Sequence, residues 1–75
     1  MSKHILFFGA SWCNPCKAAK PIVDGLGVPF QYFDIEEHAG KAIEYGVRSV
    51  PTFIVIEGGE VVGYYNDVHK LKANV

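Results

Sequence analysis

The chain has little net charge and no long hydrophobic run. Its 75 residues contain 7 basic and 8 acidic side chains, which leaves a net charge of −1. A balance this close to zero gives no electrostatic basis for binding nucleic acid or an anionic membrane. Apolar runs such as Ile5 to Phe8 are far too short for a transmembrane helix. We therefore expect neither nucleic acid nor a membrane as a partner.

The N-terminal segment also lacks the pattern of a secretory signal. Its apolar run is shorter than the roughly 7 to 15 residues of a signal-peptide core, and no small-residue cleavage site follows. We therefore expect a cytoplasmic protein. Cysteines in a reducing compartment are more often catalytic than structural.

Potential metal ligands are scarce. A zinc site usually needs four ligands in paired spacing, whereas this chain has two cysteines and three well-separated histidines, His4, His38 and His69. We therefore expect no metal site within the chain, although a cluster shared between two chains remains an alternative. Repeats, linkers and low-complexity tracts are absent, so we expect residues 1–75 to form one small domain, monomeric in solution.

Both cysteines lie in the segment Trp12 to Lys17, at the junction of an apolar strand and a helix. A cysteine in a first helical turn faces free N–H groups and the positive end of the helix dipole, which favour the thiolate. We therefore expect Cys13 to attack, and Cys16, one turn on and pointing inward, to resolve. Pro15 suits a first turn because its missing N–H has no partner there. Lys17 adds positive charge near the site.

The pattern of apolar residues and turn signals predicts an α/β protein. The expected order is strand, helix, strand, helix, strand, strand, helix, at His4–Gly9, Cys13–Leu26, Val28–Ile35, His38–Tyr45, Thr52–Glu57, Glu60–Tyr65 and a short helix ending near Asn74. The expected N-cap of the last helix is Asn66 or Asp67. This βαβαββα order favours a four-stranded mixed sheet with helices on both faces.

The sequence resembles the thioredoxin and glutaredoxin superfamily from Ile5 to Leu71. Trp12 to Lys17 reads W-C-N-P-C-K and is similar to the thioredoxin motif W-C-G-P-C-K, with Asn14 in place of the glycine. Tyr45 to Thr52 is similar to the segment that leads into the thioredoxin cis-proline loop. A bare C-x-x-C is a weak signal, but combined with V-P-T after an intervening βα unit it is specific. The resemblance implies a thioredoxin-like fold.

The resemblance also implies a substrate-binding surface around the cysteines. In the family the proline matched by Pro51 is cis and lies against the active-site sulfurs. The backbone of the preceding residue, here Val50, pairs with an extended substrate peptide. Trp12 would offer an apolar docking surface beside the nucleophile; the alternative is that its ring packs against the first helix.

The chain departs from thioredoxins at a buried pair of charged residues. Thioredoxins carry an aspartate on the first strand and a lysine on the next strand that help proton transfer at the resolving cysteine. We expect Phe7 and Phe30 at the matching positions, so both charges would be replaced together. Cys16 would then lose its proton by another route, through water or Lys17.

A second departure concerns the glutathione motif G-G-x-x-D-L of glutaredoxins. Here Gly63 to Val68 reads G-Y-Y-N-D-V, so that Gly63 and Asp67 match and Tyr64 replaces the second glycine. The Tyr64 ring would either block glutathione or contact a protein substrate. Asp67 would either contact the substrate or cap the last helix.

The resemblance implies a thiol-disulfide oxidoreductase that reduces protein disulfides. It would need no bound cofactor beyond the Cys13–Cys16 redox-active disulfide, and thioredoxin reductase or glutathione would recycle it. A narrower hypothesis makes the chain an electron donor to ribonucleotide reductase. The alternatives are a glutathione-dependent glutaredoxin and a binding or metal- and iron-sulfur-handling module without redox turnover.

Overall fold

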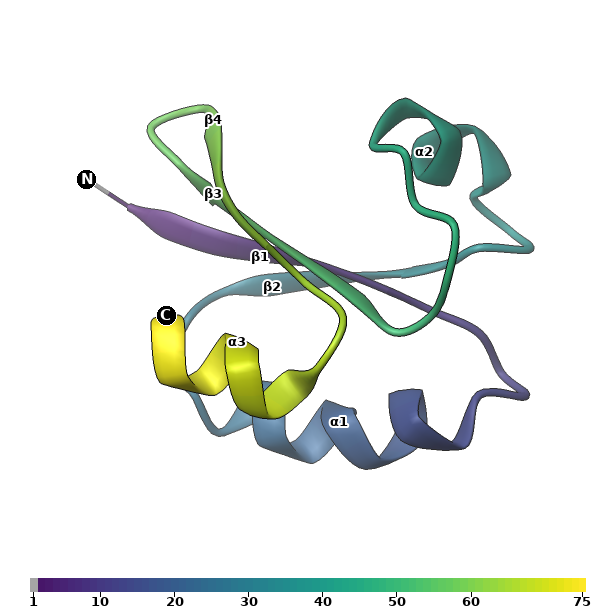
Figure 1. Ribbon diagram of the computed structural model, residues 1–75, viewed down its shortest axis with the longest axis horizontal. Helices are drawn as coiled ribbons and strands as arrows, with labels where there is room; N and C mark the ends of the chain where they lie inside the picture. Colours follow the sequence, from purple (N-terminus) through teal and green to yellow (C-terminus); the bar gives the residue numbers. More distant parts are fainter. Residues whose placement is uncertain (1) are drawn as a thin grey trace.

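The computed structural model describes residues 2–75 and contains the seven predicted elements in the predicted order (Figure 1). In chain order they are β1 (Lys3–Gly9), α1 (Asn14–Asp24), β2 (Phe30–Asp34), α2 (Ala39–Glu44), β3 (Thr52–Glu57), β4 (Glu60–Tyr65) and α3 (Val68–Asn74). The α/β class and the βαβαββα order are therefore confirmed.

The strands form one mixed sheet in the order β2-β1-β3-β4. Strand β1 is parallel to β2 and antiparallel to β3, and β3 and β4 form an antiparallel hairpin. The two central strands are apolar and almost wholly buried, as expected for strands covered on both faces. The chain leaves central β1 directly into the segment that carries both cysteines.

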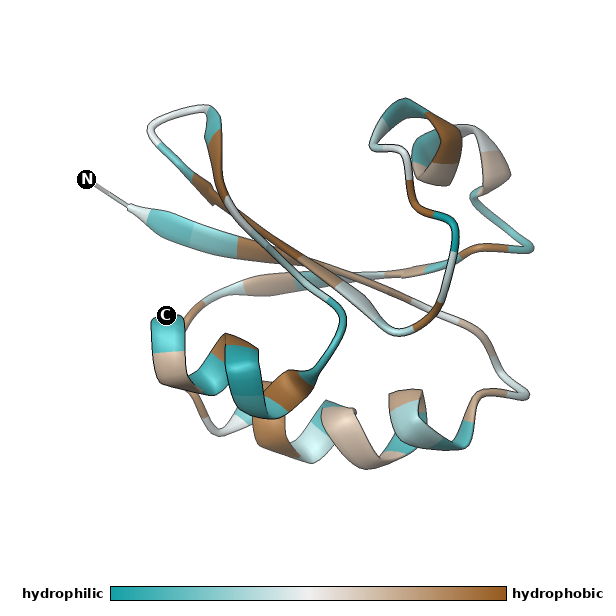
Figure 2. Cartoon of the chain, viewed as in Figure 1, coloured by the Kyte–Doolittle hydropathy of each residue, from teal (hydrophilic) through white to brown (hydrophobic). Residues whose placement is uncertain are grey.

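Helices cover both faces of the sheet: α1 and α3 lie on one side and α2 on the other (Figure 1). Alternate residues of the strands point to opposite faces, which separates the core into two clusters. The site-side cluster joins strand residues to α1 and α3 and comprises Ile5, Phe7, Ala10, Cys13, Cys16, Ala19, Val23, Phe53, Val55 and Leu71. The α2-side cluster comprises Leu6, Phe8, Ala42, Ile54 and Ile56. Figure 2 shows hydrophobic residues along the centre of the sheet between these helices.

Element ends differ from the predicted bounds by up to two residues. Helix α1 starts after Cys13, which is its N-cap, and stops at the C-cap Gly25. Strand β2 starts at Phe30 rather than Val28. The hairpin strands match the prediction, with Gly58 and Gly59 both at positive φ in the turn.

The helix caps follow local sequence signals. Asp67 is the N-cap of α3, and its side chain accepts a hydrogen bond of 2.7 Å from the backbone N–H of His69. Gly46 follows α2 at a φ of 69°, a conformation that favours glycine. None of the helices within residues 2–75 is long and apolar enough to cross a membrane.

Candidate active site

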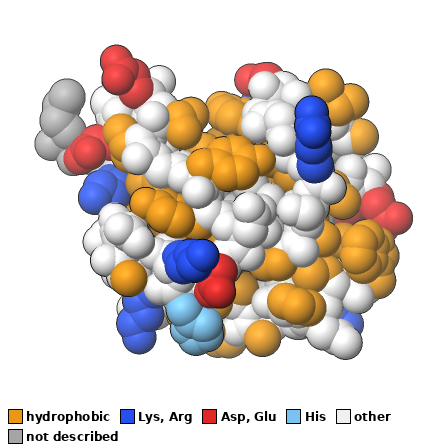
Figure 3. Space-filling view, viewed as in Figure 1, with side chains coloured by type: hydrophobic (Ala, Val, Ile, Leu, Met, Phe, Trp, Pro, Cys, Tyr) orange, Lys and Arg blue, Asp and Glu red, His pale blue; other side chains and the backbone are white. Residues whose placement is uncertain are grey.

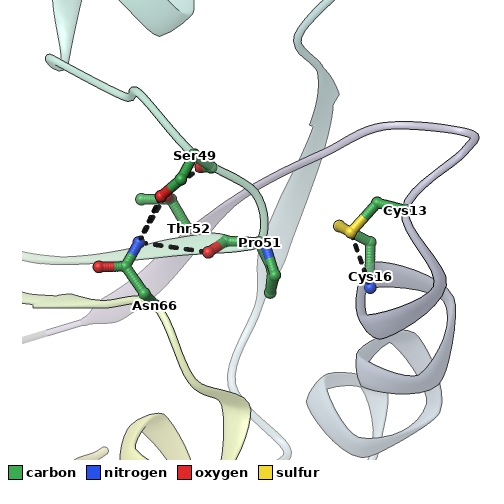
Figure 4. Close-up of a disulfide and its surroundings, with 6 residues drawn as sticks. All are labelled: Cys13, Cys16, Ser49, Pro51, Thr52 and Asn66. Carbon is green, nitrogen blue, oxygen red and sulfur yellow. Dashed lines mark hydrogen bonds between the residues drawn. A yellow bond between two sulfur atoms is a disulfide. The ribbon is translucent and has the colours of Figure 1, made fainter.

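The two cysteines form the predicted disulfide at the start of α1 (Figure 4). Cys13 lies in extended conformation as the N-cap, and its Sγ accepts a hydrogen bond of 3.2 Å from the backbone N–H of Cys16. Cys13 is 5% exposed and Cys16 1%. Cys13, at the positive end of the helix, is thus the more exposed residue of the pair, which suits its sulfur to be the attacking thiolate.

The residues around the disulfide are largely exposed. Asn14 and Pro15 form the first turn of α1, where the proline needs no hydrogen-bond partner. Lys17 points to solvent. Trp12 is 62% exposed, so the structure does not place its ring in the core, and a large apolar surface stands beside the nucleophile.

The loop before β3 brings Val50 and Pro51 to the side of the sheet on which the disulfide lies. The Val50–Pro51 peptide bond is cis, as predicted. Val50 packs against the site-side cluster, which contains both cysteines. The two segments that sequence analysis joined, one at the start of α1 and one before β3, therefore meet in space.

Asn66 links this loop to the end of β4, whereas the sequence predicts for it only a possible role as a helix cap. Its Nδ2 donates to Thr52 Oγ1 at 2.9 Å, to the Pro51 carbonyl oxygen at 3.3 Å and to Ser49 Oγ at 3.4 Å (Figure 4). The buried Thr52 hydroxyl in turn donates to the Ser49 carbonyl oxygen at 2.7 Å. We call these four residues the Asn66 clasp; they hold the loop that carries the cis proline.

A cavity of about 390 Å³ lies beside the cis-proline loop. Its walls come from α1, the cis-proline loop and the start of α3, through Pro15, Ala18, Ala19, Ile22, Pro51 and Asn66–His69. The α1 wall is apolar, and the α3 wall adds amide, carboxylate and imidazole groups. In the space-filling view, apolar side chains gather over α1, and charged and histidine side chains lie over α3 (Figure 3).

The other two predicted substrate contacts occupy different surroundings. Asp67 lines the cavity, but its carboxylate is engaged as the N-cap of α3. Tyr64 pairs with Ile54, a residue of the α2-side cluster, and so lies on the sheet face away from the disulfide. The Tyr64 hydroxyl donates to the Gly46 carbonyl oxygen at 3.2 Å. The structure thus brings Asp67, and not Tyr64, to the region of Pro51.

The direct neighbour of Phe7 on β2 is Tyr32, and the Phe30 ring also lies near Phe7, with ring centroids 6.4 Å apart. The sheet register pairs Phe7 with Tyr32, whereas Phe30 pairs with Ile5. The rings of Phe7 and Tyr32 meet edge to face, with centroids 5.1 Å apart. Phe30 and Tyr32 share one face of β2 because they are two residues apart, so the sequence alone could not distinguish them without the register.

Tyr32 and the resolving cysteine both border Gly9. A Cβ at Gly9 would lie 2.8 Å from the Tyr32 hydroxyl oxygen and 3.1 Å from Cys16 Sγ, so both atoms border the space that this glycine leaves open. Lys20 Nζ stands 4.0 Å from the centroid of the Tyr32 ring. Burial, followed by the negative charges of Asp34 and Glu37, raises the pKa of Tyr32 above its ordinary value.

No group of three or more histidine, cysteine or acidic side chains that could hold a metal ion occurs within residues 2–75. The disulfide is the redox-active group of the site, and its chemistry requires no bound cofactor: thiolate attack exchanges one S–S bond for another.

The comparisons with known proteins agree with this geometry. The thioredoxin family model matches residues 1–75. The chain is 36% identical over 61 residues to a thioredoxin of Chlorobaculum thiosulfatiphilum, which covers 73% of the chain and 56% of the relative. It is 41% identical over 64 residues to thioredoxin H4 of Arabidopsis thaliana, which covers 77% of the chain and 54% of the relative. The chain thus spans a little over half the length of these relatives.

Solved structures show the same fold. Thioredoxin of Fasciola hepatica superimposes with a TM-score of 0.88 at 29% identity, covering 96% of this chain and 76% of that one. A thioredoxin of Nicotiana alata gives a TM-score of 0.87 at 28% identity, covering 96% and 69%. With its disulfide at a helix start, its V-P-T loop and its four-stranded mixed sheet, the chain belongs to the thioredoxin family.

Proposed function

We propose that the protein is a thiol-disulfide oxidoreductase that reduces protein disulfides through the Cys13/Cys16 dithiol. The observation that carries the proposal is the disulfide itself, formed between an N-cap cysteine and a buried partner one turn along. The helix N-terminus stabilises a thiolate on Cys13. Because Cys16 is buried, its sulfur is shielded from the substrate and reacts with Cys13 instead.

The proposed reaction has two exchange steps. The Cys13 thiolate attacks one sulfur of the substrate disulfide, the substrate S–S bond breaks, and its other sulfur leaves as a thiolate that takes a proton from water. The Cys16 thiolate then attacks Cys13 Sγ, which releases the second substrate sulfur and forms the Cys13–Cys16 disulfide. The substrate gains two electrons, and the protein loses two.

Docking of the substrate would use the surface around the disulfide. Exposed Trp12 supplies apolar area, and the backbone at Val50 and Pro51 supplies an edge for an extended peptide. The cavity between α1 and α3 is large enough for an apolar substrate side chain. Protein substrates of varied sequence are therefore favoured over one small molecule.

Insulin reduction with dithiothreitol tests the proposal. The wild-type protein should accelerate precipitation of the insulin B chain, and Cys13→Ser should reduce the rate to background. A wild-type rate equal to background, or an undiminished rate in Cys13→Ser, would exclude the function. Recycling is tested by adding NADPH with thioredoxin reductase in one reaction and glutathione with glutathione reductase in another; family membership favours thioredoxin reductase.

A donor role towards ribonucleotide reductase is a narrower form of the same proposal, as is a cytoplasmic location. The small size and the dithiol are compatible with both. Reconstitution of ribonucleotide reductase with this protein as its sole dithiol source tests the former; deoxyribonucleotide formation no faster than without it would exclude the role.

A further inference from the structure

Cys16 lies among apolar side chains, yet the proposed reaction needs it as a thiolate. It is 1% exposed and belongs to the site-side cluster together with Phe7. Within residues 2–75 no side chain donates a hydrogen bond to its sulfur in the oxidised state. Apolar burial disfavours the charged form of any thiol. A hydrogen-bond donor near Sγ would therefore speed the second exchange step.

Tyr32 is placed to be that donor. Its hydroxyl oxygen and Cys16 Sγ both lie about 3 Å from the same point, the position of a Cβ at Gly9. Gly9 puts no side chain at that point, and two atoms that each lie about 3 Å from it are at most about 6 Å apart, which is within the reach of one bridging water. The hydroxyl has no hydrogen-bond partner within the described residues and is free for this role.

The charges around Tyr32 favour the neutral phenol at physiological pH. Asp34 on β2 and Glu37 in the following turn act with burial to raise its pKa, while the Lys20 ammonium on α1 lies over the ring face. Strand β1 contributes only Gly9 and Phe7 at this point, neither of them charged. A neutral phenol donates a hydrogen bond, whereas a phenolate would repel the thiolate.

We propose that the Tyr32 hydroxyl donates a hydrogen bond to the Cys16 sulfur when the dithiol is reduced or Cys13 holds a substrate, and so stabilises the attacking thiolate. This inference rests on the proposed function. In the step concerned the Cys16 proton leaves to water and Tyr32 keeps its own. The new Cys13–Cys16 bond forms as the Cys13–substrate bond breaks, and the electron pair departs on the substrate sulfur.

The direct test measures the pKa of the Cys16 thiol by thiolate absorbance at 240 nm in a Cys13→Ser background. Tyr32→Phe keeps the ring and its contacts with Phe7 and Lys20 and removes only the hydroxyl. A hydrogen bond to a charged group is worth enough to shift a pKa by about one to two units, so we expect Tyr32→Phe to raise the Cys16 pKa by that amount. Tyr45→Phe, which removes a hydroxyl from the α2 side, is the matched control and should leave it unchanged.

A rise below about half a unit in Tyr32→Phe, or an equal rise in Tyr45→Phe, overturns the proposal. Because no substrate is present, this result is independent of whether the protein reduces insulin. A second measurement keeps both cysteines: release of a thiol from a preformed mixed disulfide at Cys13 should slow about 10-fold at pH 7 in Tyr32→Phe, and the difference should vanish at alkaline pH. An equal slowing at all pH values would instead indicate a structural role and contradict the proposal.

Discussion

The two faces of the sheet differ in the number of residues that they bury. The site side has ten clustered buried residues, two helices and a set of contacting aromatic rings that includes Phe7 and Phe53, 4.8 Å apart. The α2 side has five, beneath a helix of six residues in which only Ala42 is buried. Ile43 of that helix is 79% exposed. The larger buried core therefore lies on the side of the sheet that carries the disulfide.

The largest expected difference is between two isomeric residues on opposite sides. Leu71 is fully buried and fixes α3, so Leu71→Ala should lower the free energy of unfolding by about 2–5 kcal/mol. Ile43→Ala removes the same number of atoms from the surface of α2 and should change it by less than about 0.5 kcal/mol. Urea denaturation of both variants measures the difference. Equal losses would show that α2 is as firmly packed as α3.

The Asn66 clasp should contribute less than Leu71 to the free energy of unfolding but more than Leu71 to substrate binding. Asn66→Ala removes three hydrogen bonds to the cis-proline loop, and we expect a loss of about 1–3 kcal/mol together with a raised KM for insulin. Asn74→Ala is the matched control, because the Asn74 amide donates to a backbone carbonyl at the exposed end of α3. If the two variants had the same KM, the clasp would play no part in docking.

The caps of the two short helices offer a smaller contrast. Asp67→Ala removes the side-chain cap of α3 and should cost about 1 kcal/mol, whereas Asp67→Asn should retain most of it. His38 at the start of α2 makes no side-chain cap hydrogen bond, so His38→Ala should have little effect. Thermal unfolding at pH 7 compares the three. A larger loss of stability in His38→Ala than in Asp67→Ala would contradict the conclusion that α3, and not α2, has a stabilising side-chain cap.

Sequence patterns predicted the hairpin best and the ends of α1 and β2 less well. Strands Thr52–Glu57 and Glu60–Tyr65 were predicted to the residue because β-branched runs flank a two-glycine turn. The cis bond before Pro51 also agreed with prediction, whereas Cys13 is the N-cap of α1 and not its predicted first residue. Apolar periodicity continues past Asp24 into Leu26, which is why the predicted helix was too long.

The parts of the site that sequence could not supply are contacts between distant segments. Asn66 meets residues 14 to 17 positions away, and nothing in its neighbourhood in the sequence indicates those partners. The approach of Tyr32 to Cys16 depends on the register of β1 against β2 and on the space at Gly9.

The smallest expected effect is on alkaline stability. The pKa of Tyr32 is raised in the folded protein, so folding favours its protonated form. That contribution is fully present below the unfolded pKa of about 10 and is lost as pH rises through the higher folded value. The oxidised wild type should therefore lose stability above pH 10 more steeply than Tyr32→Phe does, while Tyr45→Phe should follow the wild type. Denaturation at pH 9 to 11.5 tests this, and parallel curves for wild type and Tyr32→Phe would contradict it.

Trapping of the mixed disulfide tests the division of labour between the two cysteines most directly. Cys16→Ser, incubated with a disulfide-containing protein and analysed by mass spectrometry without reductant, should accumulate a covalent adduct on Cys13. Cys13→Ser should form little adduct, because its remaining cysteine, Cys16, is a buried residue that is 1% exposed. Equal trapping by the two variants, or preferential trapping through Cys16, would contradict the assignment of Cys13 as the attacking thiolate.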